Sequence, residues 1–95
     1  MKKLAIVTGA NKGLGLSVAQ KLVHNNYKVI LACRDKTKGQ QAEKFLGENA
    51  TFIELDLSDS ISIDNFSNEI SQSYSGVNVL YNNAGLIYQD FNLTE

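Results

Sequence analysis

The chain has 95 residues, of which 43% are hydrophobic and 20% are charged, and its net charge is −1 at pH 7. This length and composition predict one globular domain over residues 1–95. The near-zero net charge and the scattered lysines argue against nucleic acid or an anionic membrane surface as the main partner. The lone cysteine, Cys33, excludes an internal disulfide and favours a reducing, cytoplasmic compartment.

The first predicted elements are a strand, a helix and a second strand. Residues 3–8 read as a fully buried strand because their apolar residues are continuous rather than alternating. A helix from Leu14 to the asparagines at 25–26 follows, and residues 27–33 form the next buried strand. The helix carries an apolar stripe typical of a helix that lies on a sheet: Leu14, Val18, Ala19, Leu22 and Val23.

The same alternation continues through the second half of the chain. Asp35 caps a second predicted helix, which ends at Gly47. Residues 51–55 form a third strand, Ser58 or Asp59 caps a third helix, and residues 77–81 form a fourth strand. The apolar face of the second helix is Ala42, Phe45 and Leu46, and that of the third is Ile63, Phe66, Ile70 and Tyr74.

Strands that alternate with helices predict an α/β fold with a parallel sheet, because each connection is too long for a hairpin. Right-handed crossovers then favour the strand order 3-2-1-4 with helices on both faces. This is part of the doubly wound Rossmann fold, whose ligands bind at the carboxyl ends of the strands.

The turn after the first strand, residues 8–15, reads TGANKGLG. A buried strand that runs through glycines into a helix presents free backbone N–H groups and a positive helix end to an anion. Gly9 permits the tight turn, Gly13 lets a pyrophosphate approach the backbone, and Gly15 lets the helix pack closely. The turn therefore predicts a dinucleotide phosphate site.

Short motifs follow all four predicted strands: the glycine turn, Arg34-Asp35, Asp56-Leu57 and the NNAG run at 82–85. With these four motifs in order, the chain resembles the N-terminal part of a short-chain dehydrogenase/reductase, in the NADPH-dependent carbonyl reductase group. The resemblance covers essentially the whole chain. It implies a partial Rossmann fold and a nicotinamide dinucleotide as the cofactor.

Arg34 and Lys12 indicate which dinucleotide the site takes. Arg34 stands about twenty residues after the glycine turn, where an NAD-specific site has an acid on the ribose 2′-OH. An arginine there offers a bidentate donor to a 2′-phosphate, and Lys12 adds a second cation, so the pair favours NADP(H). The alternative for both side chains is an ordinary solvated surface charge.

The resemblance also implies that Asp56 contacts the adenine, with Leu57 beside it; the alternative for Asp56 is a turn or helix cap. It implies that Asn83 to Gly85 approach the ribose, whereas Asn82 stabilises the sheet. Two residues depart from the family pattern: Asn78 replaces an aspartate and Tyr81 a small aliphatic residue. The predicted cofactor-binding residues are Gly9, Asn11, Lys12, Gly13, Leu14, Gly15, Arg34, Asp56, Leu57, Asn83, Ala84 and Gly85.

No catalytic residue is predicted. The family uses a serine and a Tyr-x-x-x-Lys pair that lie beyond the fourth strand, and no tyrosine here has a lysine four residues later. His24 and Cys33 are interpreted as structural, and no metal site is predicted. We therefore expect the NADP(H)-binding part of a carbonyl-reductase-like oxidoreductase without its C-terminal catalytic half, with a carbonyl substrate only in a longer parent.

The alternative is a short nucleotide-binding or regulatory protein without catalysis. Under either hypothesis, residues 77–81 are expected to form an open, apolar sheet edge, and such an edge invites pairing with another chain. The alternative protein would associate with its partner, or with a second copy, through that strand.

Overall fold

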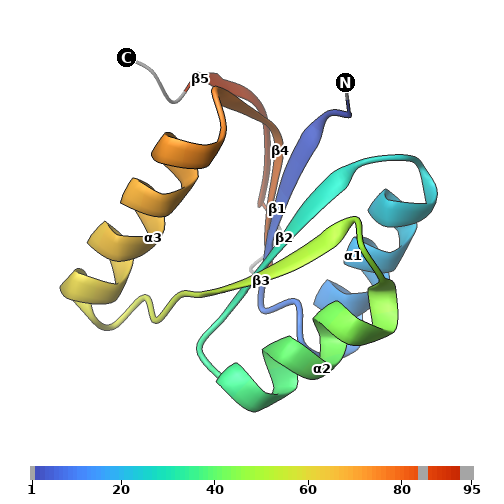
Figure 1. Cartoon of the computed structure of the whole chain (residues 1–95), viewed down its shortest axis with the longest axis horizontal. Helices are drawn as coiled ribbons and strands as arrows, with labels where there is room; N and C mark the ends of the chain where they lie inside the picture. Colours follow the sequence, from blue (N-terminus) through green and yellow to red (C-terminus); the bar gives the residue numbers. More distant parts are fainter. Residues whose placement is uncertain (1, 84–85, 93–95) are drawn as a thin grey trace.

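A single sheet runs through the molecule, with helices on both faces (Figure 1). The computed structural model describes residues 2–83 and 86–92. The strands are β1 (Leu4–Thr8), β2 (Lys28–Cys33), β3 (Ala50–Glu54), β4 (Gly76–Asn82) and β5 (Leu86–Asn92). The helices are α1 (Gly13–His24), α2 (Lys36–Leu46) and α3 (Ser60–Ser73).

The sheet order is β3-β2-β1-β4-β5, and β1 to β4 are parallel to their neighbours. The predicted order 3-2-1-4 is therefore confirmed. The bounds of these four strands differ from the predicted ones by at most one residue at either end. All four carboxyl ends meet at one edge of the sheet, which is where the predicted site belongs.

The prediction of an open edge at residues 77–81 is wrong. After Asn83 the chain returns as β5, which pairs antiparallel with β4, so that Tyr81 lies opposite Ile87 and Val77 opposite Phe91. This pairing provides partners for backbone groups that an edge strand would leave free. Association through an exposed β4 therefore has no basis in this structure.

The core lies on both faces of the sheet, because successive strand residues point to opposite sides. Val7, Val29 and Leu31 pack toward α1 and α2, whereas Ile6 and Ile30 pack toward α3. The central strands are therefore buried on both faces, as their continuous apolar runs predicted.

Three positions assigned to apolar helix faces are exposed instead: Leu14 in α1, Phe45 in α2 and, at 36%, Ile63 in α3. Leu14 is 64% exposed and Phe45 is 67% exposed, so neither joins the apolar face assigned to its helix. Leu14 lies in the first turn of α1, and Phe45 lies toward the end of α2. Helical spacing identifies a face but not how far the neighbouring elements extend over it.

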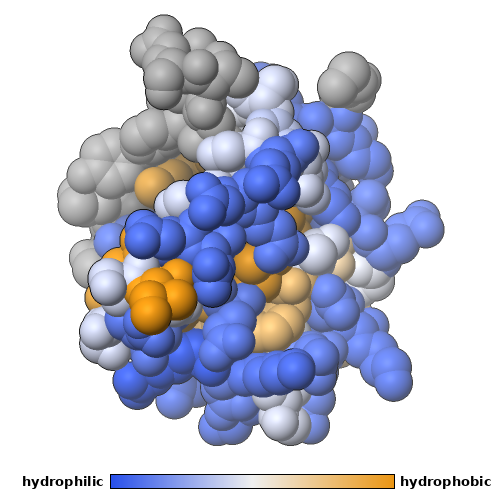
Figure 2. Space-filling model, turned by 60° about the vertical axis from the view of Figure 1, so that its left-hand side comes forward, coloured by the Kyte–Doolittle hydropathy of each residue, from blue (hydrophilic) through white to orange (hydrophobic). Residues whose placement is uncertain are grey.

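The face that carries α3 also exposes apolar side chains. Figure 2 brings this side forward and shows apolar atoms among the hydrophilic surface. Leu57 and Ile61 are about two-thirds exposed, at 65% and 68%. The cover provided by α3 is therefore partial, as expected for a chain of this size.

Both departures from the family pattern in β4 have local explanations. Tyr81 is only 9% exposed and lies in the cluster on the α1 side together with Ala5, Ala10 and Ala19. Small neighbours make room for its ring. Asn78 accepts a hydrogen bond from the Leu4 backbone N–H at 2.9 Å and so ties the starts of β1 and β4 together.

The outer edge of β3 is partly closed by a side chain. The Phe52 N–H donates to the Glu43 carboxylate at 2.7 Å, across from α2. Glu43 thus occupies a backbone donor that another strand would otherwise use. The edge is blunted without a further strand.

Candidate functional site

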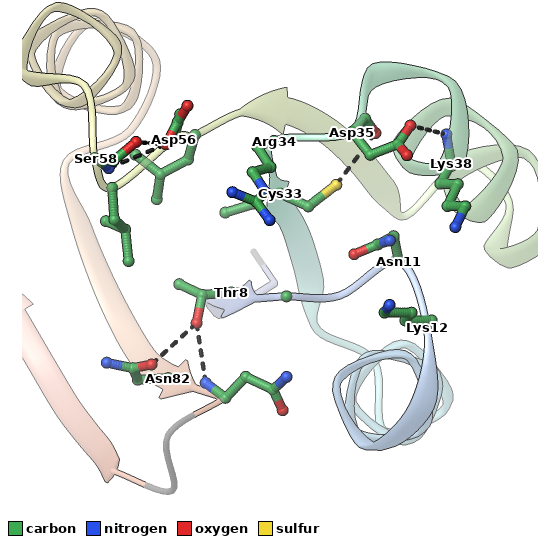
Figure 3. Close-up of a pocket in the computed structure, with 15 residues that line it drawn as sticks. Thr8, Asn11, Lys12, Cys33, Arg34, Asp35, Lys38, Asp56, Ser58 and Asn82 are labelled. Carbon is green, nitrogen blue, oxygen red and sulfur yellow. Dashed lines mark hydrogen bonds between the residues drawn. The ribbon is translucent and has the colours of Figure 1, made fainter.

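A cleft of about 560 Å³ opens at the carboxyl ends of β1 to β4. Its lining comes from four strand ends and the loops that follow them: Thr8, Gly9, Asn11, Lys12, Ala32, Cys33, Arg34, Asp35, Lys38, Leu55, Asp56, Leu57, Ser58, Asn82 and Asn83. Figure 3 shows Lys12 and Lys38 on one side of this cleft, Asp56 and Ser58 on the other, and Arg34 between them.

The glycine turn forms one wall of the cleft. Gly9 has φ +61°, a left-handed conformation that favours glycine, and its N–H donates to the Ala32 carbonyl at 2.8 Å. A Cβ on Gly15 would overlap the Gly9 carbonyl oxygen, so α1 approaches the turn more closely than any other residue would allow. The expected roles of Gly9 and Gly15 agree with this geometry.

The start of α1 differs from the starts of the other two helices. Asp35 caps α2 by accepting from the Lys38 N–H, and Asp59 caps α3 by accepting from the Ile61 N–H, both at 3.0 Å. The N-cap of α1 is Lys12, which makes no side-chain cap hydrogen bond. A Cβ on Gly13 would meet nothing within 4 Å. The positive end of α1 is thus left without an acidic cap and is open to an anion.

Three cations line this part of the cleft. Lys12 comes from the glycine turn, Arg34 follows β2, and Lys38 lies in the first turn of α2. All three residues are exposed. Lys38 is not among the predicted site residues, because its position in the chain suggests only a helix surface. The signal available in the sequence is its place four residues after Arg34, within the first turn of a helix.

Asp56 lies on the opposite side of the cleft and is held in a tight turn. Its Oδ1 accepts from the Ser58 hydroxyl at 2.6 Å and from the Ser58 N–H at 3.0 Å. These hydrogen bonds lower the pKa of Asp56 below its ordinary value, chiefly through the Ser58 hydroxyl. The structure therefore gives Asp56 the turn role considered as its alternative, while the residue also lines the cleft.

Thr8 joins the ends of β1 and β4 at the floor of the cleft. Its hydroxyl donates to Asn82 Oδ1 at 3.3 Å and accepts from the Asn83 N–H at 3.0 Å (Figure 3). Asn82 therefore holds the sheet together, as expected. The link also fixes where the chain leaves β4 beside the glycine turn.

Seven of the predicted binding residues line the cleft: Gly9, Asn11, Lys12, Arg34, Asp56, Leu57 and Asn83. Gly13, Leu14 and Gly15 belong to the adjoining turn and helix start but do not line it. Ala84 and Gly85 lie outside the described residues. Cys33 also lines the cleft, but burial raises the pKa of its thiol, so it has little thiolate near neutral pH.

The small net charge conceals a strong division along the chain. All nine Lys and Arg residues lie within residues 2–44, whereas residues 45–95 contain eight Asp and Glu. The face with α1 and α2 is therefore rich in cations, and α3 carries acidic residues but no Lys or Arg. The cleft lies where these regions meet, with its cations on the side of α1 and α2.

The family model for short chain dehydrogenase matches residues 3–95. The chain belongs to the short-chain dehydrogenase family. Members of this family are oxidoreductases that bind a nicotinamide dinucleotide. The cleft lies at the carboxyl ends of the parallel strands, where open α/β sheets bind their ligands.

Several proteins to which this chain is similar are named as reductases. Carbonyl reductase [NADPH] 1 of Rattus norvegicus is 37% identical over 92 residues, which are 93% of this chain and 33% of the relative. Menthone neomenthol reductase from Mentha piperita has a TM-score of 0.79 at 33% identity, covering 90% of this chain and 32% of that protein. An actinorhodin polyketide ketoreductase structure with NADPH has a TM-score of 0.79 at 28% identity, covering 86% and 33%.

This chain spans about a third of the length of the curated relatives that it matches. Within residues 2–83 and 86–92, no helix is long and apolar enough to cross a membrane. The described part of the chain also contains no group of three His, Cys, Asp or Glu residues placed to hold a metal ion.

Proposed function

We propose that the chain is the NADP(H)-binding part of a carbonyl-reductase-like oxidoreductase. In this proposal the cleft holds the adenosine and pyrophosphate of the cofactor, and the catalytic groups belong to a longer parent. The cofactor supplies the hydride for reduction of a ketone or aldehyde. Residues 1–95 contribute binding and orientation.

The observation that carries the proposal is the uncapped start of α1 beside three cations. Two of the three helices have an aspartate at the N-cap, but α1 has Lys12 there and no side-chain cap. A dinucleotide phosphate would accept hydrogen bonds from the free N–H groups of this first turn, and its negative charge would complement the helix dipole. Gly13 leaves space for that approach.

The preference for NADP(H) over NAD(H) rests on Arg34, Lys12 and Lys38. An acid that follows the second strand binds the ribose hydroxyls of NAD, whereas Arg34 offers its planar guanidinium to a 2′-phosphate. The two lysines border the same part of the cleft and add positive charge. The ketoreductase structure was solved with NADPH, and the rat reductase carries NADPH in its name; both support the same choice.

At the other side of the cleft, Asp56 and Leu57 are proposed to receive the adenine. Leu57 is 65% exposed and is therefore available for contact with a flat ring. One Asp56 oxygen is already used by Ser58, so its carboxylate is held in place by the turn. Asn83 is proposed to approach the ribose from the end of β4.

The compartment and the activity of the 95 residues alone are also proposals. The single cysteine favours a reducing location such as the cytoplasm. Residues 1–95 contain no Tyr-x-x-x-Lys, so we expect no carbonyl reduction by this stretch alone. NADPH-dependent turnover by the purified 95-residue chain would contradict this part of the proposal.

Arg34→Asp tests the cofactor preference. A charge-assisted hydrogen bond is worth about 1.5–3 kcal/mol, and the exposure of Arg34 favours the lower end. We therefore expect affinity for adenosine 2′,5′-bisphosphate to fall about tenfold, with little change for 5′-AMP. Both affinities are measured by calorimetric titration.

The matched control is Lys44→Asp, which makes the same change of net charge on an exposed residue of α2 outside the cleft. It should leave the preference for the 2′-phosphate intact. Equal losses in the two variants would mean that Arg34 acts only through the overall charge, and the assignment of Arg34 to the 2′-phosphate would fail.

A further inference from the structure

A second groove of about 360 Å³ runs between α1 and α2, next to the cleft. It is lined by Asn11, Lys12, Leu16, Lys38, Gln41, Ala42 and Phe45. Asn11, Lys12 and Lys38 also line the cleft, so the two cavities share a wall of polar and cationic side chains. The volume is near the lower limit for a site that binds a small molecule.

The contribution of α2 to this groove is one face of the helix. Positions 38, 41, 42 and 45 have the spacing of residues that lie above one another on a helix surface. The chemistry changes along that face, from a lysine at the end shared with the cleft to a phenylalanine at the far end. From α1, only Leu16 lines the groove, which explains why Phe45 remains 67% exposed.

The charges give the groove a direction. Lys12 and Lys38 lie at one end, and none of the lining residues is acidic. Glu43 of α2 is engaged with the Phe52 N–H at the edge of β3, and Asp35 accepts from the Lys38 N–H. One end of the groove is therefore cationic, and the rest offers Leu16, Ala42 and Phe45.

We propose that this groove is a second binding site for a small amphipathic anion. Its phosphate or carboxylate head would pair with Lys12 and Lys38, and its alkyl or aromatic part would lie between Leu16, Ala42 and Phe45. The inference rests on the proposed function in one respect: the head uses lysines that also serve the cofactor 2′-phosphate. Such a ligand therefore competes with NADP(H) and regulates occupancy of the cleft.

The test uses the 95-residue chain with decyl phosphate and decanoate, both kept below their micelle concentrations. Inorganic phosphate and decanol serve as the separate halves of the ligand. Decyl phosphate or decanoate should weaken the apparent affinity for adenosine 2′,5′-bisphosphate in a saturable manner, and each half should need at least about tenfold more ligand for the same effect. If the nucleotide binds but neither amphiphile competes with it, the proposal is overturned.

Phe45→Ser separates the groove from the cleft. The variant should lower the affinity for decyl phosphate at least about tenfold, because a large apolar contact is lost, and should leave the affinity for adenosine 2′,5′-bisphosphate unchanged. The control is Ile61→Ser, which removes another highly exposed apolar residue, on α3. Similar losses in both variants would show nonspecific adsorption to apolar surface and would refute the site.

Amide chemical shifts distinguish failure of this site from failure of the proposed function. Decyl phosphate should shift the amides of Gln41 and Phe45, whereas adenosine 2′,5′-bisphosphate should also shift those of Asp56 and Ser58. If the nucleotide does not bind but decyl phosphate still shifts Gln41 and Phe45, the second site stands and the cofactor proposal fails. If the nucleotide binds but decyl phosphate shifts neither Gln41 nor Phe45, the cofactor proposal stands and the second site fails.

Discussion

Replacement of Gly15 by alanine sets helix propensity against packing at the turn that defines the site. In an unobstructed helix position, glycine to alanine stabilises by about 1 kcal/mol. At Gly15 the new Cβ would overlap the Gly9 carbonyl oxygen and would lie 3.2 Å from the Ala10 Cα. These neighbours are backbone atoms, so the conflict can be relieved only by moving the turn or the helix.

Overpacking of this kind costs about 1–3 kcal/mol. Because the overlap is with backbone atoms, the upper part of this range applies, about 2–3 kcal/mol. After subtraction of the gain in propensity of about 1 kcal/mol, we expect Gly15→Ala to lower the free energy of unfolding by about 1–2 kcal/mol. For a domain of this size the melting temperature should fall by roughly 5–15 °C. Affinity for adenosine 2′,5′-bisphosphate should fall as well, because relief of the overlap moves the N–H groups of the turn.

Urea denaturation followed by circular dichroism measures the stability, and calorimetric titration measures the affinity. Ser17→Ala is the matched control, because Ser17 is exposed on the same helix and should change stability by no more than about 0.5 kcal/mol. A Gly15→Ala protein that is as stable as the original, with unchanged nucleotide affinity, would refute the close-approach argument.

Three further predictions concern hydrogen bonds. Thr8→Val removes both hydrogen bonds of the Thr8 hydroxyl and should lower the free energy of unfolding, measured by urea denaturation, by about 1 kcal/mol. Thr8→Ser keeps the hydroxyl and should lower it less. The pKa of Asp56 is lower in the folded state than its ordinary value of 3.8. The ionised carboxylate therefore stabilises the fold at pH values above 3.8, and this stabilisation is lost as the pH falls through the folded-state pKa. Ser58→Ala should raise that pKa in a carboxyl NMR titration and flatten the acid limb of stability; an unchanged pKa would contradict the cause given. Glu43→Ala should lower the free energy of unfolding by about 1 kcal/mol, because it frees the Phe52 N–H, and should increase light scattering as the exposed edge of β3 associates. Glu43→Gln keeps an acceptor for that N–H and should cause smaller changes in both measurements.

The strand order and the location of the site could be predicted because they depend on local patterns. Continuous apolar runs indicated buried parallel strands, and the handedness of the crossovers then left few orders for four strands. Residues that follow parallel strands meet at one edge, so the sequence alone could place Lys12, Arg34 and Asp56 together.

The remaining features depend on tertiary placement. Residues 86–92 pair with β4 because that edge had free backbone groups, and nothing within the segment itself specifies an antiparallel return. Lys38 reaches the cleft only because α2 starts beside it. Phe45 has the spacing of a core residue, but α1 provides only Leu16 along that groove. Periodicity cannot predict where the cover by a neighbouring helix stops.

Calorimetric titration of the purified 95-residue chain with NADPH and with NADH decides whether the cleft recognises the 2′-phosphate. One 2′-phosphate distinguishes these ligands, and Lys12, Arg34 and Lys38 are the groups proposed to detect it. We expect saturable binding of NADPH at one site, at least about tenfold tighter than binding of NADH at the same ionic strength. Equal affinities for the two dinucleotides, or a preference for NADH, would contradict this expectation.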